Sequence, residues 1–377
     1  MAKPFALPAT AEAFAQASWA DIEPFYGELA ARPISLDTVE AWLADWSRLE
    51  ELLSEAAARA MIAYTVDTES AEREADHLRF STEVLPKADE EGVRLARRLL
   101  ELGYTRADLA SMIERFRTQI EIFREANVPL SAQLEELSAR YQKITGGMTV
   151  QWEGREVTLP QLQPHLKSVD RTVREKAFRL LAQPFLEQHQ ELAALFSRMY
   201  QSRQRMAANA GFSNYRDYAF RSKFRFDYTP EDVDRFHQAV EAVVSPAVER
   251  LRKKRRERLQ LPTLRPWDIQ VDPDGKPALT PFRDVGDLER TTQQVMQRLD
   301  PVLGRQFETM MKERLLDLDT RKGKAPGGYC ETLHESGRPF IFMNAAGTFD
   351  DVMTLCHEAG HAFHAFAAHH LRFIWQR

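Results

Sequence analysis

The sequence Thr348-Phe-Asp-Asp-Val-Met-Thr-Leu-Cys-His-Glu-Ala-Gly-His361 carries the clearest structural and chemical signal in the chain. Its first four residues are typical of a helix start, because the Thr348 hydroxyl can cap the helix and Asp351 falls in the first turn. Apolar residues then recur at helical spacing, and we expect the helix to end at about His370. The preceding apolar run Pro339–Asn344 has the composition of a strand. The sequence therefore predicts a strand that leads through a short turn into a helix.

Two histidines on this helix have the spacing of metal ligands. Residues four apart lie on one helical face, so His357 and His361 can present two imidazole nitrogens to one zinc ion. The carboxylate of Glu358 can then reach a water molecule held by the metal and act as a general base in peptide-bond hydrolysis. The alternative is a pair of structural histidines on a buried helix. We predict a catalytic site that binds one zinc ion.

The neighbouring residues on the helix are weaker candidates. His364 lies too far along the axis for comfortable tetrahedral closure, so a packing or supporting role is expected in place of direct ligation. Cys356 projects about 100° away from the pair around the helix and is not expected to bind the metal. His369 and His370 are expected at the surface.

The strand before the helix is predicted to form a sheet edge on which an extended peptide docks through main-chain hydrogen bonds. The residues that follow it, in the turn to the helix, would lie over the site. The candidate substrate-binding residues are therefore Asn344, Ala345, Ala346 and Gly347.

Helical periodicity dominates the rest of the chain, with breaks expected at Pro86, Gly103 and Asn127-Val-Pro129. Trp42 and Trp46 are interpreted as packing residues. The expected helices span 35–63, 72–80, 89–102, 106–126, 131–144, 170–181, 184–209, 229–260 and 285–316.

Several local signals refine this pattern. Ser35 is the candidate cap of the first of these helices, and Thr229 with Asp232 is typical of a capping box. A break or kink is expected at Pro246. A period of two at 148–159 predicts a β-hairpin.

The basic run Arg250–Arg258 can serve an anionic partner or form a solvated helix face. We favour the solvated face, because no aromatic residues interleave with the charges. The proline-rich segment 262–281 is predicted to be a loop.

Composition excludes several classes of protein. The chain has 377 residues and a net charge of −5, with 44% hydrophobic and 28% charged residues, as in soluble globular proteins. The slightly acidic balance predicts no nucleic-acid partner, and no apolar run is long enough for a membrane span. Prolines interrupt the run Met1–Pro8, so no signal peptide is expected. Two cysteines, Cys330 and Cys356, fit a reducing cytoplasm, which is the expected location.

These features resemble the oligoendopeptidase F and thimet oligopeptidase family of zinc metallopeptidases. The block Asp351–His364 fits the family pattern His-Glu-x-Gly-His-x-x-His, and the runs Arg321–Cys330 and Pro339–Asn344 also match. Weaker similarity extends through the hairpin and the segment 168–178. The resemblance covers most of the chain, and residues 1–110 carry it least.

The resemblance implies a mainly α, two-lobed fold of the zincin type, with a small β element beside the active-site helix. It divides the chain into an N-terminal helical lobe at 1–145 and a catalytic domain that begins at 146 and continues to 377. It also implies a deep channel that admits short, unstructured peptides. His357 and His361 would be the zinc ligands and Glu358 the general base.

The third zinc ligand of this family is a Glu on a following helix, and no Asp or Glu follows Glu358 before Arg377. We therefore expect the N-terminal portion of such an enzyme, inactive alone and completed by a missing C-terminal segment. One alternative is a non-catalytic peptide-binding or metal-binding protein. Another is one half of a split enzyme whose partner chain supplies the Glu. A ligand such as Glu331 or Glu335 is a further alternative.

Overall fold

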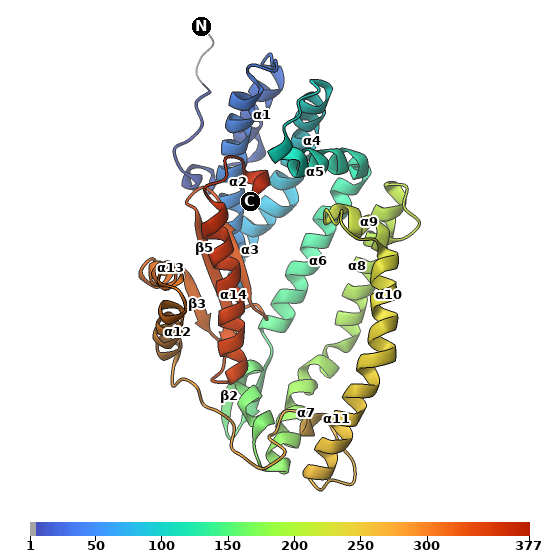
Figure 1. Cartoon of the computed structure of the whole chain (residues 1–377), viewed down its shortest axis with the longest axis vertical. Helices are drawn as coiled ribbons and strands as arrows, with labels where there is room; N and C mark the ends of the chain where they lie inside the picture. Colours follow the sequence, from blue (N-terminus) through green and yellow to red (C-terminus); the bar gives the residue numbers. More distant parts are fainter. Residues whose placement is uncertain (1–4) are drawn as a thin grey trace.

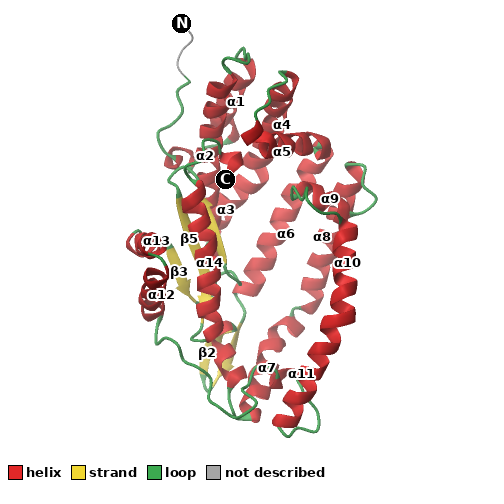
Figure 2. Cartoon of the chain, viewed as in Figure 1, coloured by secondary structure: helices red, strands yellow, loops and turns green. Residues whose placement is uncertain are grey.

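The chain is mainly helical with small sheets, as predicted (Figure 2). The computed structural model describes residues 5–377, so part of the Met1–Pro8 run lies outside the described residues. The α-helices of the described residues are α1 (Trp19–Ala31), α2 (Val39–Val66), α3 (Ala71–Leu78), α4 (Leu85–Glu101), α5 (Ala110–Ile122), α6 (Val128–Gly146), α7 (Arg171–Glu187), α8 (His189–Asn209), α9 (Tyr215–Ser222), α10 (Pro230–Ala239), α11 (Ser245–Arg258), α12 (Val285–Leu299), α13 (Pro301–Lys312) and α14 (Phe349–Ala368). The strands are β1 (Thr149–Trp152), β2 (Arg155–Thr158), β3 (Leu316–Asp319), β4 (Tyr329–Leu333) and β5 (Arg338–Ala345).

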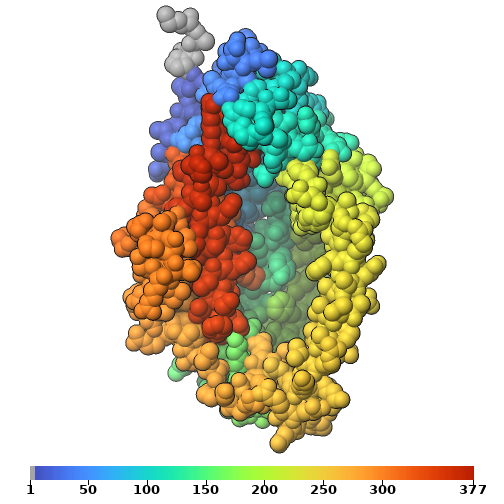
Figure 3. Space-filling view, in the orientation of Figure 1, coloured from blue at the N-terminus to red at the C-terminus, as the bar shows by residue number. Residues whose placement is uncertain are grey.

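The elements surround a deep hollow. Figure 1 shows α1, α4 and α5 at one end and α7 and α11 at the other, with α14 along one side and α10 along the opposite side. In the space-filling view the hollow lies between α14, in red, and α10 and α11, in yellow (Figure 3). None of the helices of the described residues is both long enough and apolar enough to cross a bilayer.

The N-terminal helices pack around a large apolar cluster. Trp42 and Trp46 are 1% and 2% exposed, which confirms that they are packing residues. Phe373, from beyond α14, is fully buried in the same cluster, and the Trp375 ring lies 4.4 Å from that of Trp46. The end of the described chain is therefore held against the N-terminal helices. The predicted boundary between 145 and 146 falls at the end of α6 and stays a prediction.

Two prolines that were expected to interrupt helices lie in continuous helical backbone. Pro86 follows a π-helical segment, Arg79–Val84, and Pro246 follows another, Val240–Val244. A wider π turn can accommodate a residue that lacks an N–H and would clash with the carbonyl four residues earlier. The prediction of a break at Pro86 is therefore wrong.

Three other predicted helix boundaries are wrong for local reasons. Pro184 lies inside α7, so α8 begins only at His189. The predicted helix 285–316 is two antiparallel helices, because the Asp300 side chain accepts a hydrogen bond from the Val302 N–H and caps α13. Ser35 lies ahead of α2, whose N-cap is Thr38.

Other expectations are confirmed. β1 and β2 form the predicted antiparallel hairpin, and its turn residues Glu153 and Gly154 have φ values of 50° and 79°. Thr229 and Asp232 form the predicted capping box of α10. No residue of α11 is buried, as expected for the basic run on a solvated face.

The second sheet corrects a functional expectation. Its strand order is β3-β5-β4, so β5 is the central strand and pairs on both sides, parallel with β3 and antiparallel with β4. The prediction that 339–344 forms the edge is wrong, because its main-chain groups are already used by two neighbours. The edge strands of this sheet are instead β3 and β4.

Candidate metal centre and peptide-binding edge

The start of α14 is fixed by a reciprocal cap. The Thr348 N–H and Oγ1 donate to Asp351 Oδ2 at 2.7 and 3.0 Å, and the Asp351 N–H donates to Thr348 Oγ1 at 3.3 Å. Asp351 Oδ2 also accepts from the Ala346 N–H at 3.0 Å. This confirms the predicted helix start and ties the turn after β5 to the helix that carries the histidines.

One face of α14 anchors it to the core. Leu355, Ala359 and Ala362 are fully buried against the sheet and helices α12 and α13. The opposite face carries His357 and His361, and both of these residues are exposed. The amphipathic pattern of the helix therefore turns the two imidazoles away from the core.

The two imidazoles converge on one point. The Nε2 atoms of His357 and His361 lie 3.2 Å apart, and the ring planes are at 85° to each other. Two nitrogens bound to one tetrahedral zinc, each about 2.05 Å from the metal, are roughly 3.3 Å apart. The pair therefore has the separation that two ligands of a single zinc ion require.

Glu358 lies between the two histidines in sequence and is 8% exposed. Across from it, burial raises the pKa of the Cys330 thiol to about 12, and the charges of Glu358 and Glu331 add to this shift. The helix that carries Glu358 also contacts β4.

Other candidate ligands do not join the pair. Among residues 5–377 no group of three or more His, Cys, Asp or Glu side chains is placed to hold a metal ion. His364 is exposed. Glu335 is engaged by Arg48, with Oε1 3.0 Å from Nη2. Glu331 lines a cavity between the N-terminal helices and β4.

The remaining helix residues occupy the predicted environments. His369 and His370 are exposed, as expected, although the His369 ring packs closely over Gly337. Cys356 is half-buried, and burial raises the pKa of its thiol. None of these three residues adds a further side chain to the histidine pair.

The residues predicted to bind substrate mostly serve the turn itself. The Asn344 side chain donates to the carbonyls of Ala325 and Gly327 at 2.9 and 3.0 Å, and Ala345 is buried. Gly347 has a φ of 96°, a conformation that L side chains rarely adopt. Any contact of these residues with a substrate stays a prediction.

A buried lysine that we did not predict holds the sheet beside the site. Lys324 Nζ donates to Asp317 Oδ1 and to the carbonyls of Asp317, Asp319 and Met343, at 2.5 to 3.0 Å. Its side chain is fully buried, which lowers its pKa to about 8. The run Arg321–Cys330 contained this residue, but its acceptors come from β3 and β5, so no local pattern could reveal them.

The edge strand is also anchored. The Tyr329 ring stacks on that of Phe342 at 4.8 Å, and its hydroxyl lies 2.6 Å from Thr65 Oγ1 on α2. Among the described residues β4 pairs only with β5, so its other edge has no strand partner. An ordered, open edge next to Glu358 is suited to holding an extended peptide.

Fold and site together define a class: mainly helical proteins with a His-Glu-x-x-His helix beside a small sheet. The chain belongs to peptidase family M3, whose sequence profile matches residues 165–372. It is 25% identical over 209 residues to the Group B oligopeptidase PepB of Streptococcus agalactiae serotype III (strain NEM316), covering 53% of this chain and 32% of that protein. It is 32% identical over 68 residues to the chromosomal oligoendopeptidase F of Lactococcus lactis subsp. cremoris, covering 17% of this chain and 11% of that protein.

Solved structures agree with this assignment. A crystal structure described as an oligoendopeptidase F has a TM-score of 0.90 and 27% identity, covering 95% of this chain and 64% of that chain. PZ peptidase A with an inhibitor also has a TM-score of 0.90, with 25% identity and coverage of 95% and 65%. The chain thus spans less than two thirds of these structures and about a third of PepB.

Proposed function

We propose that the protein carrying this chain is a zinc-dependent endopeptidase that hydrolyses internal bonds of short, unstructured peptides. The observation that carries the proposal is the 3.2 Å separation of the His357 and His361 Nε2 atoms, next to the buried Glu358. Membership of peptidase family M3 supports the peptidase activity, and the names of its relatives support short peptides as substrates.

The chain's own residues suit this reaction. A zinc ion held by His357 and His361 would supply a Lewis acid beside the scissile bond. The open edge of β4 would hold the peptide backbone in an extended conformation. Glu358 would take a proton from the attacking water while the hydroxyl oxygen bonds to the carbonyl carbon, and would deliver that proton to the amine as the C–N bond breaks.

The hollow supports a limit on substrate size. The histidine-bearing helix borders it, with α10 and α11 on the far side (Figure 3). A flexible peptide can enter such a space, whereas a folded protein would have to unfold before its backbone met β4. We therefore propose that hydrolysis is confined to short peptides.

Metal removal tests this proposal. We expect chelation to abolish hydrolysis of a short, internally quenched peptide, and added zinc to restore it. The same bond inside a folded protein should resist cleavage. Activity that persists in His357→Ala or His361→Ala, or in fully chelated protein, would contradict the proposal.

A second candidate function is non-catalytic peptide binding, which the lack of a three-ligand group among residues 5–377 favours. Catalytic zinc sites usually have three protein ligands, so a third would come from a side chain outside these residues or from a partner chain. Peptide binding without hydrolysis, in zinc-saturated protein, would support this candidate over the first.

A further inference from the structure

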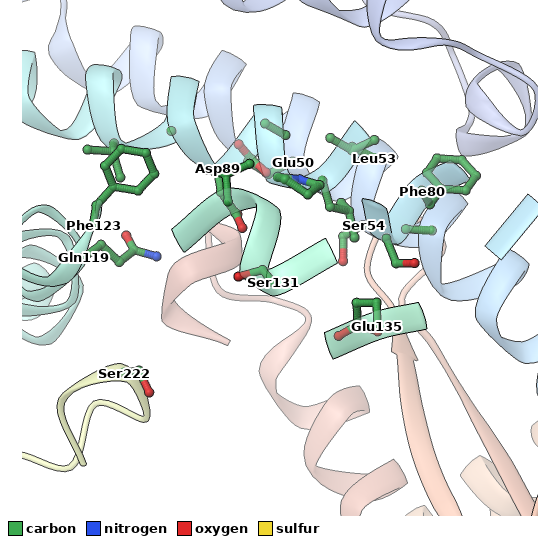
Figure 4. A pocket seen from close by; sticks show the side chains of 18 of the residues that line it. Glu50, Leu53, Ser54, Phe80, Asp89, Gln119, Phe123, Ser131, Glu135 and Ser222 are labelled. Atoms are coloured by element: carbon green, nitrogen blue, oxygen red, sulfur yellow. The ribbon is translucent and has the colours of Figure 1, made fainter. Parts of the chain in front are cut away.

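A large cavity opens between the N-terminal helices and the edge strand. Its volume is about 750 Å³, and its walls come from α2, α4, α5, α6 and β4. Aromatic rings, among them Trp46, Phe80, Phe116 and Phe123, form much of the lining. Figure 4 shows Glu50, Asp89 and Glu135 around this space, each from a different helix.

The cavity is lined by more acidic than basic side chains. Glu50, Asp89, Glu135 and Glu331 all line it. Desolvation raises the pKa of Asp89 to about 6. It also raises the pKa of Glu135, and in both cases it is the sole cause. No hydrogen bond or cationic charge from the described residues lowers either pKa. Asp89 lines the cavity and is exposed to solvent there, although neighbouring protein atoms crowd its carboxylate.

The cationic side chains of the lining are already engaged or neutral. The Arg124 guanidinium donates to the carbonyls of Glu121, Phe123 and Ala210 at 2.7 to 3.3 Å. The His77 ring is stacked on Tyr64, and burial lowers its pKa. Neither group forms an ion pair with the carboxylates, so among the described residues the cavity combines aromatic walls with acidic side chains that have no salt-bridge partner.

The cavity begins next to the proposed active site. Glu331 lines it from β4, the strand that also contacts the histidine-bearing helix α14. Adjacent strand residues are about 3.3 Å apart, so a peptide extended along β4 can reach from Glu358 into the cavity within a few residues.

We propose that this cavity is a substrate subsite that binds a cationic group of the peptide, either a basic side chain or the free amino terminus. The inference rests on the proposed peptidase function and adds a substrate class to it: peptides whose positive charge lies a few residues from the scissile bond. An ammonium or guanidinium group would supply the ionic hydrogen bonds that Asp89 and Glu135 lack, and the aromatic walls would pack against its aliphatic stem.

Binding of dye-labelled peptides, followed by fluorescence anisotropy in chelator, tests the subsite independently of zinc and hydrolysis. One peptide carries arginine and a free amino terminus. A second replaces arginine with the neutral isostere citrulline, and a third has an acetylated amino terminus. We expect about tenfold tighter binding of the first peptide than of whichever analogue lacks the recognised charge. Which analogue binds weakly identifies the source of the charge.

The double variant Asp89→Asn, Glu135→Gln should reduce this preference to less than about twofold, because the neutral side chains keep their shape but lose the charge. The matched controls are Glu90→Gln and Glu136→Gln, exposed neighbours that do not line the cavity. They should keep the preference. Any of three results would overturn the inference. Wild type could bind all three peptides with equal affinity, it could bind none of them, or the double variant could keep the wild-type preference. If the protein prefers the charged peptide but does not hydrolyse peptides, the subsite is supported and the proposed peptidase function is contradicted.

Discussion

The Nε2 atoms of His357 and His361 lie 3.2 Å apart across one turn of α14, and neither side chain is buried by a neighbouring element. Two structural histidines on a buried helix, the alternative interpretation of the sequence, would lie among packing residues. The packing face of α14 is instead occupied by Leu355, Ala359 and Ala362. The geometry is that of a metal-binding pair.

Removing either imidazole should weaken zinc binding. We expect His357→Ala and His361→Ala each to lower zinc affinity by more than about tenfold, because one ligand of the pair is lost. Titration against a competing chromogenic chelator measures the change. His364→Ala is the matched control and should bind zinc like wild type, whereas an equal loss in that variant would show that we have assigned the wrong ligands.

The cap of α14 should matter for both stability and metal binding. Asp351→Ala removes the acceptor of three donors, the Thr348 N–H, Thr348 Oγ1 and the Ala346 N–H. We expect a loss of about 1–2 kcal/mol in the free energy of unfolding, measured in urea, with weaker zinc binding. Asp350→Ala, at a side chain 74% exposed, should cost less than about 1 kcal/mol. Equal effects of the two substitutions would contradict this role of the cap.

The buried lysine should be more important than its exposed neighbour. Lys324→Met leaves three carbonyls without this donor, while Asp317 keeps its two hydrogen bonds from Arg321, and we expect a loss of about 3–5 kcal/mol in the free energy of unfolding. Lys322, which pairs with Glu156 at the surface, provides the control. Lys322→Met should change stability by less than about 1 kcal/mol. Chemical denaturation of both variants checks the prediction, and a mild effect at Lys324 would refute it.

Glu50 should make stability depend on pH. Burial raises its pKa from 4.5 to about 7, and the charge of Asp89 adds to this, although hydrogen bonds from Trp46 and Tyr26 oppose it. The folded state therefore binds the proton more tightly than the unfolded state, so this group lowers stability as the pH rises from about 4.5 to about 7. Glu50→Gln keeps an acceptor for both donors and removes the charge.

We therefore expect Glu50→Gln to unfold at higher urea concentration than wild type at pH 8, by about 1–3 kcal/mol, and to match it near pH 4.5. The exposed neighbour Glu90 provides the control, and Glu90→Gln should keep the wild-type pH profile. A Glu50→Gln protein that is less stable than wild type at pH 8 would disprove the assignment.

Local signals in the sequence predicted what local contacts determine. The capping boxes at Thr229 and Thr348 involve residues three apart, and the hairpin turn at Glu153 is set by its own backbone. Prolines were less informative, because a π segment before Pro86 or Pro246 lets the helix continue, and the local sequence does not distinguish that outcome from a break.

Non-local pairing accounts for the rest. Short strands β3 and β4 carry no long alternating pattern, so the central position of β5 was not predictable from its own residues. The acceptors of Lys324 and the carboxylates of the acidic cavity come from elements far apart in sequence. The histidine pair was predictable because both residues and their spacing belong to one helix.

The central claim is that Glu358 acts as a base beside a zinc ion held by His357 and His361. Its most direct test is the turnover of a short, internally quenched peptide by zinc-loaded wild type and Glu358→Gln, with zinc content measured in both. We predict unchanged zinc content and a loss of turnover by about 10²–10⁴-fold, because the substitution removes the proton acceptor and leaves both ligands in place. Near-normal turnover by Glu358→Gln would contradict the account.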